Sequence, residues 1–329
     1  MSHDIADARV PTSWQAWTWP GPCDALGLEL QSVPAREPAP GQVLVRNAAI
    51  GLNPVDWKVL GGLDGWVPGQ VPGVDGSGVV VAVGEGVASA WCGRRVAYHQ
   101  SLAGPGSFAA YTPVAERALL RLPDGLDFET AAAFPCPGLT AWQALAKLPS
   151  RPGRLLVSGA GGSVGHYLVA LARRAGHEVD VLCHVRHAWR LLAAGVRCAY
   201  ASVAEVLAAG ERYDAIVDTV GAARAAELAA RLRANGHLVC VQGRVAEWPH
   251  PPFGRAVSLH EVALGALHRE GDDADWAELR RAGESLLAEL ADGRLPPERL
   301  HHPARFDELA VTLDGLRHRR FDGKAVVSV

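Results

Sequence analysis

A glycine-rich stretch in the middle of the chain has the residue types and the spacing to bind a phosphate group. The apolar run Leu155 to Val157 is followed at once by glycines and then by apolar residues at helical intervals, which predicts a strand, a tight turn and a helix. Backbone N–H groups and the positive end of the helix dipole would face a pyrophosphate there, and the missing β-carbons would allow close approach. The pattern predicts dinucleotide binding, with a merely tight turn as the alternative. The residues of the predicted turn are Gly159, Gly161, Gly162, Ser163, Val164 and Gly165.

The segment after this turn indicates which cofactor is bound. Residues 177–183 read as a second strand, which completes a strand, helix, strand unit. The chain then reads CHVRH (183–187), without the acidic residue that an NAD site usually has at this place. Arg186 has a permanently charged guanidinium group whose N–H donors suit a 2′-phosphate, and His184 or His187 could help to bind that phosphate. We expect NADP(H) as the cofactor; the alternative is that Arg186 is only a solvated residue at a helix start.

The segments around the turn alternate between strand and helix. Residues 127–148 have helical spacing with an interruption at 135–137, where two prolines occur. Repeated strands and helices with short loops predict a parallel, doubly wound sheet. The expected helices are 188–194, 222–233, 274–291 and 306–317, and the expected strands are 215–218, 237–241, an edge strand within 248–264, and 324–329.

The first third of the chain has a different pattern. Between residues 14 and 122, short apolar or alternating runs are separated by Gly and Pro turns, which indicates a β-rich, barrel-like body. A chain of 329 residues is long enough for two domains. We expect residues 1–134 and 275–329 to form the β-rich domain and residues 135–274 to form the parallel-sheet domain. The fold class is therefore α/β.

Charge and composition exclude several classes of partner. The formal net charge is -3 and no run of Lys or Arg forms a basic stripe, so nucleic acid and anionic membrane are poor candidates. Neither the start of the chain nor any later apolar run resembles a signal peptide or a membrane span, so we expect a cytoplasmic protein that acts on a small molecule. The six cysteines are scattered without a C-x-x-C pair, which argues against a structural zinc lobe and a disulfide framework.

Six segments of the chain carry a family resemblance. They are GLNPVDWKVLGG (51–62), PGVDGSGVVVAVGEGV (72–87), GSFAAYTPV (106–114), PCPGLTAWQAL (135–145), SGAGGSVG (158–165) and GKAVV (323–327). Together they resemble the medium-chain dehydrogenase/reductase superfamily, specifically its zinc-independent, quinone-oxidoreductase-like branch. The resemblance implies a GroES-like catalytic domain and a Rossmann cofactor domain, with the active site in the cleft between them.

The resemblance also bears on metal binding. Where zinc-dependent relatives place a ligating Cys this chain has Asn53, and where they place a ligating His it has Val74. Neither side chain is a competent zinc ligand, and Cys136, near the third ligand position, cannot hold the ion alone. We therefore expect no metal. The alternative is that Asp75, Cys136 and one of the histidines rebuild a site.

A site without zinc favours reactions in which the negative charge is delocalised. Without a metal to stabilise an alkoxide, a reaction whose negative charge is delocalised is easier to support with hydrogen bonds alone. We expect hydride transfer from NADPH to a quinone or an α,β-unsaturated carbonyl compound. The alternatives are a zinc-independent alcohol or aldehyde dehydrogenase, and a non-catalytic NADPH-binding sensor or structural protein. The resemblance further implies a homodimer formed through the strand after Pro252.

The resemblance places further residues near the reacting groups. Asn53 would hydrogen-bond the nicotinamide ribose or a developing oxyanion, unless it is only a turn residue before Pro54. Lys58 follows in the same motif and is a candidate either for direct chemistry or for a structural ion pair. Thr140 resembles the family threonine near the phosphates, with a small core-facing hydroxyl as the alternative. Gln242 and Gly243 end a strand beside the nicotinamide, and Arg319 matches a position that reaches the 2′-phosphate in some relatives.

Overall fold

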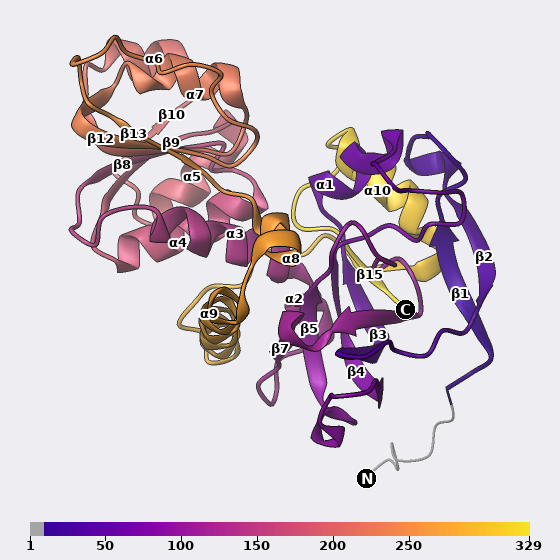
Figure 1. Ribbon diagram of the computed structural model, residues 1–329. Coiled ribbons are helices and arrows are strands. Elements are labelled where there is room, and N and C mark those ends of the chain that lie inside the picture. The colour runs from indigo at the N-terminus through magenta and orange to yellow at the C-terminus, as the bar shows by residue number, and fades with distance from the viewer. Residues whose placement is uncertain (1–9) are drawn as a thin grey trace. The chain divides into compact units, whose positions relative to one another are not determined.

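The computed structural model describes residues 10–329 and divides into two compact units (Figure 1). The first unit runs to Cys136 and resumes from Gly265 to Val329, and the second unit is Pro137–Leu264. The first is rich in strands and the second is a parallel sheet with helices, so the predicted α/β fold class is confirmed. The domain boundaries predicted at 134/135 and 274/275 stay a prediction. In the described part of the chain, no helix is long and apolar enough to cross a membrane.

The first unit is built on a seven-stranded sheet with the order β14-β15-β3-β4-β5-β7, and β6 pairs with β3. The pairs β3 with β4 and β4 with β5 are antiparallel, and β1 and β2 form a separate hairpin-like sheet. The strands are β1 (Ser13–Thr18), β2 (Glu29–Pro34), β3 (Gln42–Gly51), β4 (Asp75–Val83), β5 (Arg95–His99), β6 (Tyr111–Ala115), β7 (Leu119–Arg121), β14 (Ala304–Arg305) and β15 (Val326–Ser328).

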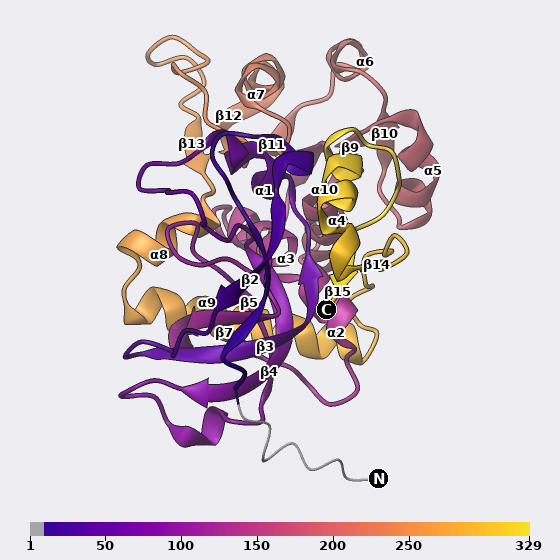
Figure 2. The ribbon, with the colours of Figure 1, turned by 90° about the vertical axis from the view of Figure 1, so that its right-hand side faces the viewer.

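Helices from both ends of the chain complete the first unit. The α10 helix packs against α1, as Figure 2 shows, and their neighbourhood contains a core of buried Trp17, Trp19 and Phe108. The predicted helical interruption near Pro135 is confirmed, because α2 ends at Ala133 and α3 begins with the proline, which suits a first helical position. The helices are α1 (Pro54–Lys58), α2 (Phe128–Ala133), α8 (Leu267–Glu270), α9 (Asp273–Ala291) and α10 (Leu309–Arg317), with α3 (Pro135–Ala146) starting at the unit boundary.

The second unit is a six-stranded sheet with the order β10-β9-β8-β11-β12-β13, and all its pairs are parallel. Helices cover both faces, with α6 and α7 on one side and α3 and α4 on the other (Figure 1). The doubly wound sheet predicted from the alternation is confirmed. The elements are β8 (Arg154–Ser158), α4 (Ser163–Arg174), β9 (Glu178–Leu182), α5 (Val185–Ala193), β10 (Cys198–Tyr200), α6 (Val203–Ala208), β11 (Tyr213–Asp218), α7 (Ala222–Ala229), β12 (Leu232–Cys240) and β13 (Ser258–Glu261).

One helix end in this unit was predicted wrongly. The helix expected over 222–233 ends at Ala229, and β12 begins at Leu232, which is buried and pairs with Tyr213. Guanidinium groups of Arg212 and Arg255 donate to backbone carbonyls at this helix end. Cationic donors at the negative end of a helix dipole stabilise such a termination.

Candidate functional site

The glycine turn of the second unit follows β8 and leads into α4. Gly159 has a φ of +78°, a conformation that side chains rarely adopt, and a β-carbon there would meet the Thr219 hydroxyl at 2.3 Å. Gly165 lies so close to the turn that a β-carbon would be 2.5 Å from the Cα of Ala160. Gly162 is the N-cap of α4, with no atom nearer than 3.7 Å to an added β-carbon. The first two glycines therefore shape the turn, whereas Gly162 has open space in front of it.

The turn and the start of α4 have the geometry of an anion site. The turn follows the carboxyl end of a parallel strand and delivers the chain into a twelve-residue helix. Ser163 and Val164 form the first turn of this helix, where the dipole favours negative charge. Ligands of open parallel sheets bind outside the carboxyl ends of the strands, which is where the predicted turn residues lie; their contact with a pyrophosphate stays a prediction.

Basic side chains gather beside this turn. His184 is the N-cap of α5, and its ring accepts from the backbone N–H of Arg186 at 3.3 Å. The Arg186 guanidinium donates to His187, whose ring is close enough to clash with a β-carbon placed on Gly161. Arg190 also donates to the Gly161 carbonyl at 3.4 Å. The structure therefore brings the predicted Arg186, His184 and His187 to the glycine turn.

Arg190 was not among the predicted site residues. It lies one helical turn after Arg186 on α5, and residues four apart share a helix face. The spacing of four residues from Arg186, which was predicted to contact the 2′-phosphate, could have identified Arg190 from the sequence.

The remaining predicted cofactor residues occupy separate places. Thr140 is a buried residue of α3. Gln242 and Gly243 lie two and three residues after β12, beyond its carboxyl end, and Gly243 has a φ of +78°. Arg319 belongs to the first unit, where it follows α10, so its contact with a 2′-phosphate stays a prediction.

In the first unit, three strand ends bring polar side chains together. The register of the sheet pairs Asp75, the first residue of β4, with Gly51 on β3 and with His99 at the end of β5. Asn53 lies two residues beyond β3. Asn53 and Asp75 are buried, and so is Lys324, just before β15. The motif around Asn53 is therefore part of a buried polar network.

Asn53 is the link in this network. Its Nδ2 donates to Asp75 Oδ2 at 2.9 Å and to the Gly51 carbonyl at 3.2 Å, and its Oδ1 accepts from the Lys324 ammonium. An amide nitrogen has two hydrogens, so both donors of Asn53 are used inside the first unit. The amide is 2% exposed. This arrangement favours Asn53 as a residue that holds the network together.

Asp56 is a second buried carboxyl beside Asn53. Its Oδ2 accepts from the backbone N–H of Asn53 at 2.7 Å, whereas its Oδ1 has no partner among the described residues. Burial raises the pKa of Asp56 to about 8, with the hydrogen bond from the Asn53 backbone and the positive charge of Lys324 opposing the rise and the negative charge of Asp75 adding to it. Asp56 is therefore mostly protonated at neutral pH.

Lys58 ends α1 on the exposed side of the same motif. Its ammonium lies 5.6 Å from the centre of the Trp57 ring, at cation–π distance. Partial desolvation lowers the pKa of Lys58. The side chain thus presents a cation at the surface of the first unit, outside the buried network.

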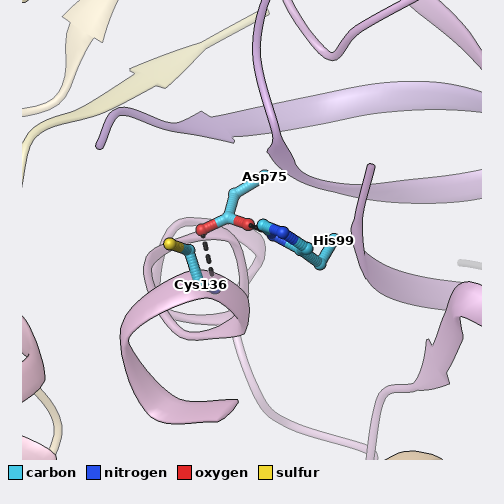
Figure 3. Close-up of side chains that lie close together, drawn as sticks. All are labelled: Asp75, His99 and Cys136. Carbon is cyan, nitrogen blue, oxygen red and sulfur yellow. Dashed lines mark hydrogen bonds and ion pairs between the residues drawn. The ribbon is translucent and has the colours of Figure 1, made fainter. Parts of the chain in front are cut away.

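Asp75, His99 and Cys136 meet at this end of the sheet (Figure 3). A carboxylate oxygen, a ring nitrogen and the Sγ atom lie within 4.8 Å of one another, which is the alternative metal set that the sequence left open, with His99 as its histidine. In this structure both carboxylate oxygens of Asp75 already have hydrogen-bond partners. Asp75 Oδ1 contacts His99 Nδ1 at 2.9 Å, and Oδ2 accepts from the Cys136 backbone N–H at 2.9 Å as well as from Asn53. If the carboxylate is ionised it only accepts, so Nδ1 carries the proton and only the Nε2 lone pair of the ring remains for a metal.

The chain is similar in sequence to a known domain family and to several known proteins. Residues 39–124 match the alcohol dehydrogenase GroES-like domain. The chain is 36% identical over 174 residues to a chloroplast envelope quinone oxidoreductase homolog of Arabidopsis thaliana, covering 50% of this chain and 53% of that protein. It is 37% identical over 182 residues to a chloroplastic NADPH-dependent alkenal/one oxidoreductase of the same plant, covering 51% and 46%. The chain therefore spans about half the length of the curated relatives it matches.

A solved structure resembles nearly the whole chain. It is an alcohol dehydrogenase superfamily protein from Novosphingobium aromaticivorans, with a TM-score of 0.84 and 26% identity, and the match covers 96% of this chain and 99% of that one. The predicted β-rich domain and parallel-sheet domain are thus those of a known fold.

Proposed function

Because this chain belongs to the medium-chain dehydrogenase/reductase superfamily and carries its GroES-like domain, we propose that it is an NADPH-dependent, metal-free reductase of a quinone or an α,β-unsaturated carbonyl compound. The observation that carries the proposal is the glycine turn with Arg186 and Arg190 beside it at the carboxyl ends of parallel strands. A pyrophosphate would bind at the start of α4, and the two guanidinium groups would meet the 2′-phosphate. The names of two relatives, a quinone oxidoreductase homolog and an alkenal/one oxidoreductase, support the acceptor class.

We assign different roles in such a reaction to different residues of the chain. When bound, the cofactor supplies the hydride, and the acceptor spreads the resulting negative charge over its conjugated system, so that hydrogen bonds can stabilise it without a metal. We assign Asn53 the role of holding the buried network at the strand ends, since both its N–H donors are used there. Lys58 is the exposed cation of the same motif and is proposed to contact the acceptor. Thr140, Gln242, Gly243 and Arg319 keep their proposed places at the cofactor.

The test of this function is NADPH oxidation by the purified protein against quinones, enones, simple aldehydes and alcohols, with a chelator present throughout. Turnover confined to the conjugated acceptors is expected. Turnover of simple alcohols or aldehydes would instead identify a zinc-independent alcohol or aldehyde dehydrogenase. NADPH binding without oxidation by any acceptor would identify a non-catalytic sensor or structural protein.

If Arg186 selects NADPH over NADH, the substitution Arg186→Gln should weaken the binding of NADPH but not of NADH. Loss of a charge-assisted hydrogen bond to the 2′-phosphate costs about 1.5–3 kcal/mol, so the KM for NADPH should rise about 10- to 100-fold. Kinetics with NADH, which has no such phosphate, should be unchanged. Arg151→Gln is a matched control, because Arg151 is an exposed arginine before the amino end of β8. Equal KM values for NADPH in Arg186→Gln and the control would contradict this assignment.

We also propose that two copies of the chain pair through β13. This strand is at the edge of the six-stranded sheet, and Trp248 and Phe253 in the preceding loop are 65% and 104% exposed. An open strand edge is a template for pairing with another chain. Light scattering coupled to gel filtration should give the mass of a dimer, and a monomer at micromolar concentration would count against the pairing. The cytoplasmic location expected from the sequence stays a prediction.

A further inference from the structure

The buried network at the strand ends contains its own cation. Lys324 is 3% exposed and Asp75 is fully buried, and each is bonded to the same Asn53 amide. The lysine ammonium donates to Oδ1, and Nδ2 donates onward to the carboxylate. A buried carboxylate needs a nearby opposite charge or several donors to remain ionised. Asp75 has both, because the amide connects it to the ammonium and three donors contact its oxygens.

This arrangement competes with a metal ion for the same atoms. An ion bound to the Asp75 carboxylate would compete with the partners that its oxygens already have, which are His99 Nδ1 at Oδ1 and the N–H groups of Asn53 and Cys136 at Oδ2. Its carboxylate ligand would also be bonded to the amide that holds the Lys324 ammonium, and an ammonium one amide away repels a divalent cation where water is excluded. Among the described residues, the unpartnered buried polar atoms include none of Asn53, Asp75, His99 or Lys324. Every buried side-chain nitrogen and oxygen of these four residues therefore already has a hydrogen-bond partner.

We infer that Lys324 is the resident cation of this cluster and that its ammonium keeps divalent metal ions out of the group formed by Asp75, His99 and Cys136. The lysine ammonium supplies the positive charge near the Asp75 carboxylate that a metal ion would otherwise supply. This inference goes beyond the proposed reaction, since metal binding can be measured whether or not any acceptor is reduced.

The experiment is a Co²⁺ titration of the full chain, followed by equilibrium dialysis and by the absorption of a cobalt–thiolate bond. Wild-type protein should retain no stoichiometric Co²⁺ and show no such band. In Lys324→Met the competing charge is gone, so the affinity for Co²⁺ should rise about 10- to 100-fold, the range by which residues around a metal site change its affinity. The band should be absent from the double variant Lys324→Met, Cys136→Ala, because the thiolate would be missing.

Two further variants keep the result interpretable. Lys147→Met removes an exposed lysine of the second unit and should behave as wild type. Lys324→Arg keeps the positive charge and should also retain no Co²⁺. Stoichiometric Co²⁺ or Zn²⁺ in wild-type protein would overturn the inference, and so would an affinity in Lys324→Met no higher than in Lys147→Met. If Lys324→Met does not fold, retention of Co²⁺ by folded Lys324→Arg at the cysteine would overturn it instead.

Discussion

Replacing Gly165 by alanine is expected to disrupt the second unit and to abolish NADPH binding. The new β-carbon would be 2.5 Å from the Cα of Ala160 and 2.6 Å from its carbonyl carbon and oxygen, all of them backbone atoms. Ala160 is fully buried and follows Gly159, whose positive φ fixes the turn, so the backbone has little room to move. Overpacking of this kind typically costs about 1–3 kcal/mol and occasionally more. Because the contact is with backbone, we expect a loss of about 3 kcal/mol or more, a large part of a typical domain's stability.

Gly162→Ala is the matched control for this prediction. Gly162 has a φ of -88°, and its nearest atom would be 3.7 Å from an added β-carbon, so the fold should lose less than about 1 kcal/mol. The same β-carbon would meet a pyrophosphate at the start of α4, so NADPH affinity should fall while the melting temperature is nearly unchanged. Circular dichroism melts and fluorescence titration with NADPH measure the two effects. Unchanged NADPH affinity in Gly162→Ala would show that the pyrophosphate does not approach this residue.

The glycine turn was predictable from sequence because its causes are local. The apolar run, the glycines and the helical spacing are contiguous, and β8, α4 and β9 follow them in order. The same is true of α9, which begins with reciprocal capping by Asp272 and Asp275. In contrast, β10 has three half-buried residues at a sheet edge, too short for a periodic pattern, and it was not predicted.

The buried network in the first unit was not predictable, because tertiary pairing creates it. Lys324 and Asn53 are 271 residues apart, and no pattern in either segment indicates the other. His99 meets Asp75 only through the register of β4 with β5, so the sequence could name a histidine of this cluster in general but not which one. The protonated state of Asp56 likewise depends on burial by distant segments.

Asp56→Asn is expected to remove a large pH dependence of stability. The pKa of Asp56 is about 8 in the folded protein, against 3.8 for an ordinary aspartate. Between these values the folded state binds more protons than the unfolded state, so its stability falls as the pH rises from about 4 to about 8. A rise of about four pKa units corresponds to a loss on the order of 5 kcal/mol. The neutral amide of asparagine keeps an acceptor for the Asn53 N–H but has no proton to lose, so this loss should be absent in the variant.

The experiment compares urea unfolding of wild type and Asp56→Asn at pH 5, 7 and 9, with Asp124→Asn as the control because Asp124 is exposed. At pH 5 the variant should be equal to wild type or slightly less stable, since both side chains are uncharged in the folded state. At pH 9 it should be several kcal/mol more stable, because wild type must then hold a buried anion beside Asp75. A stability difference that is the same at all three pH values would show that Asp56 does not titrate in this range. The network has two carboxyl groups, Asp56 and Asp75, and one ammonium, that of Lys324. Because the ammonium can compensate only one negative charge, ionisation of Asp56 at high pH must destabilise the wild-type protein relative to Asp56→Asn.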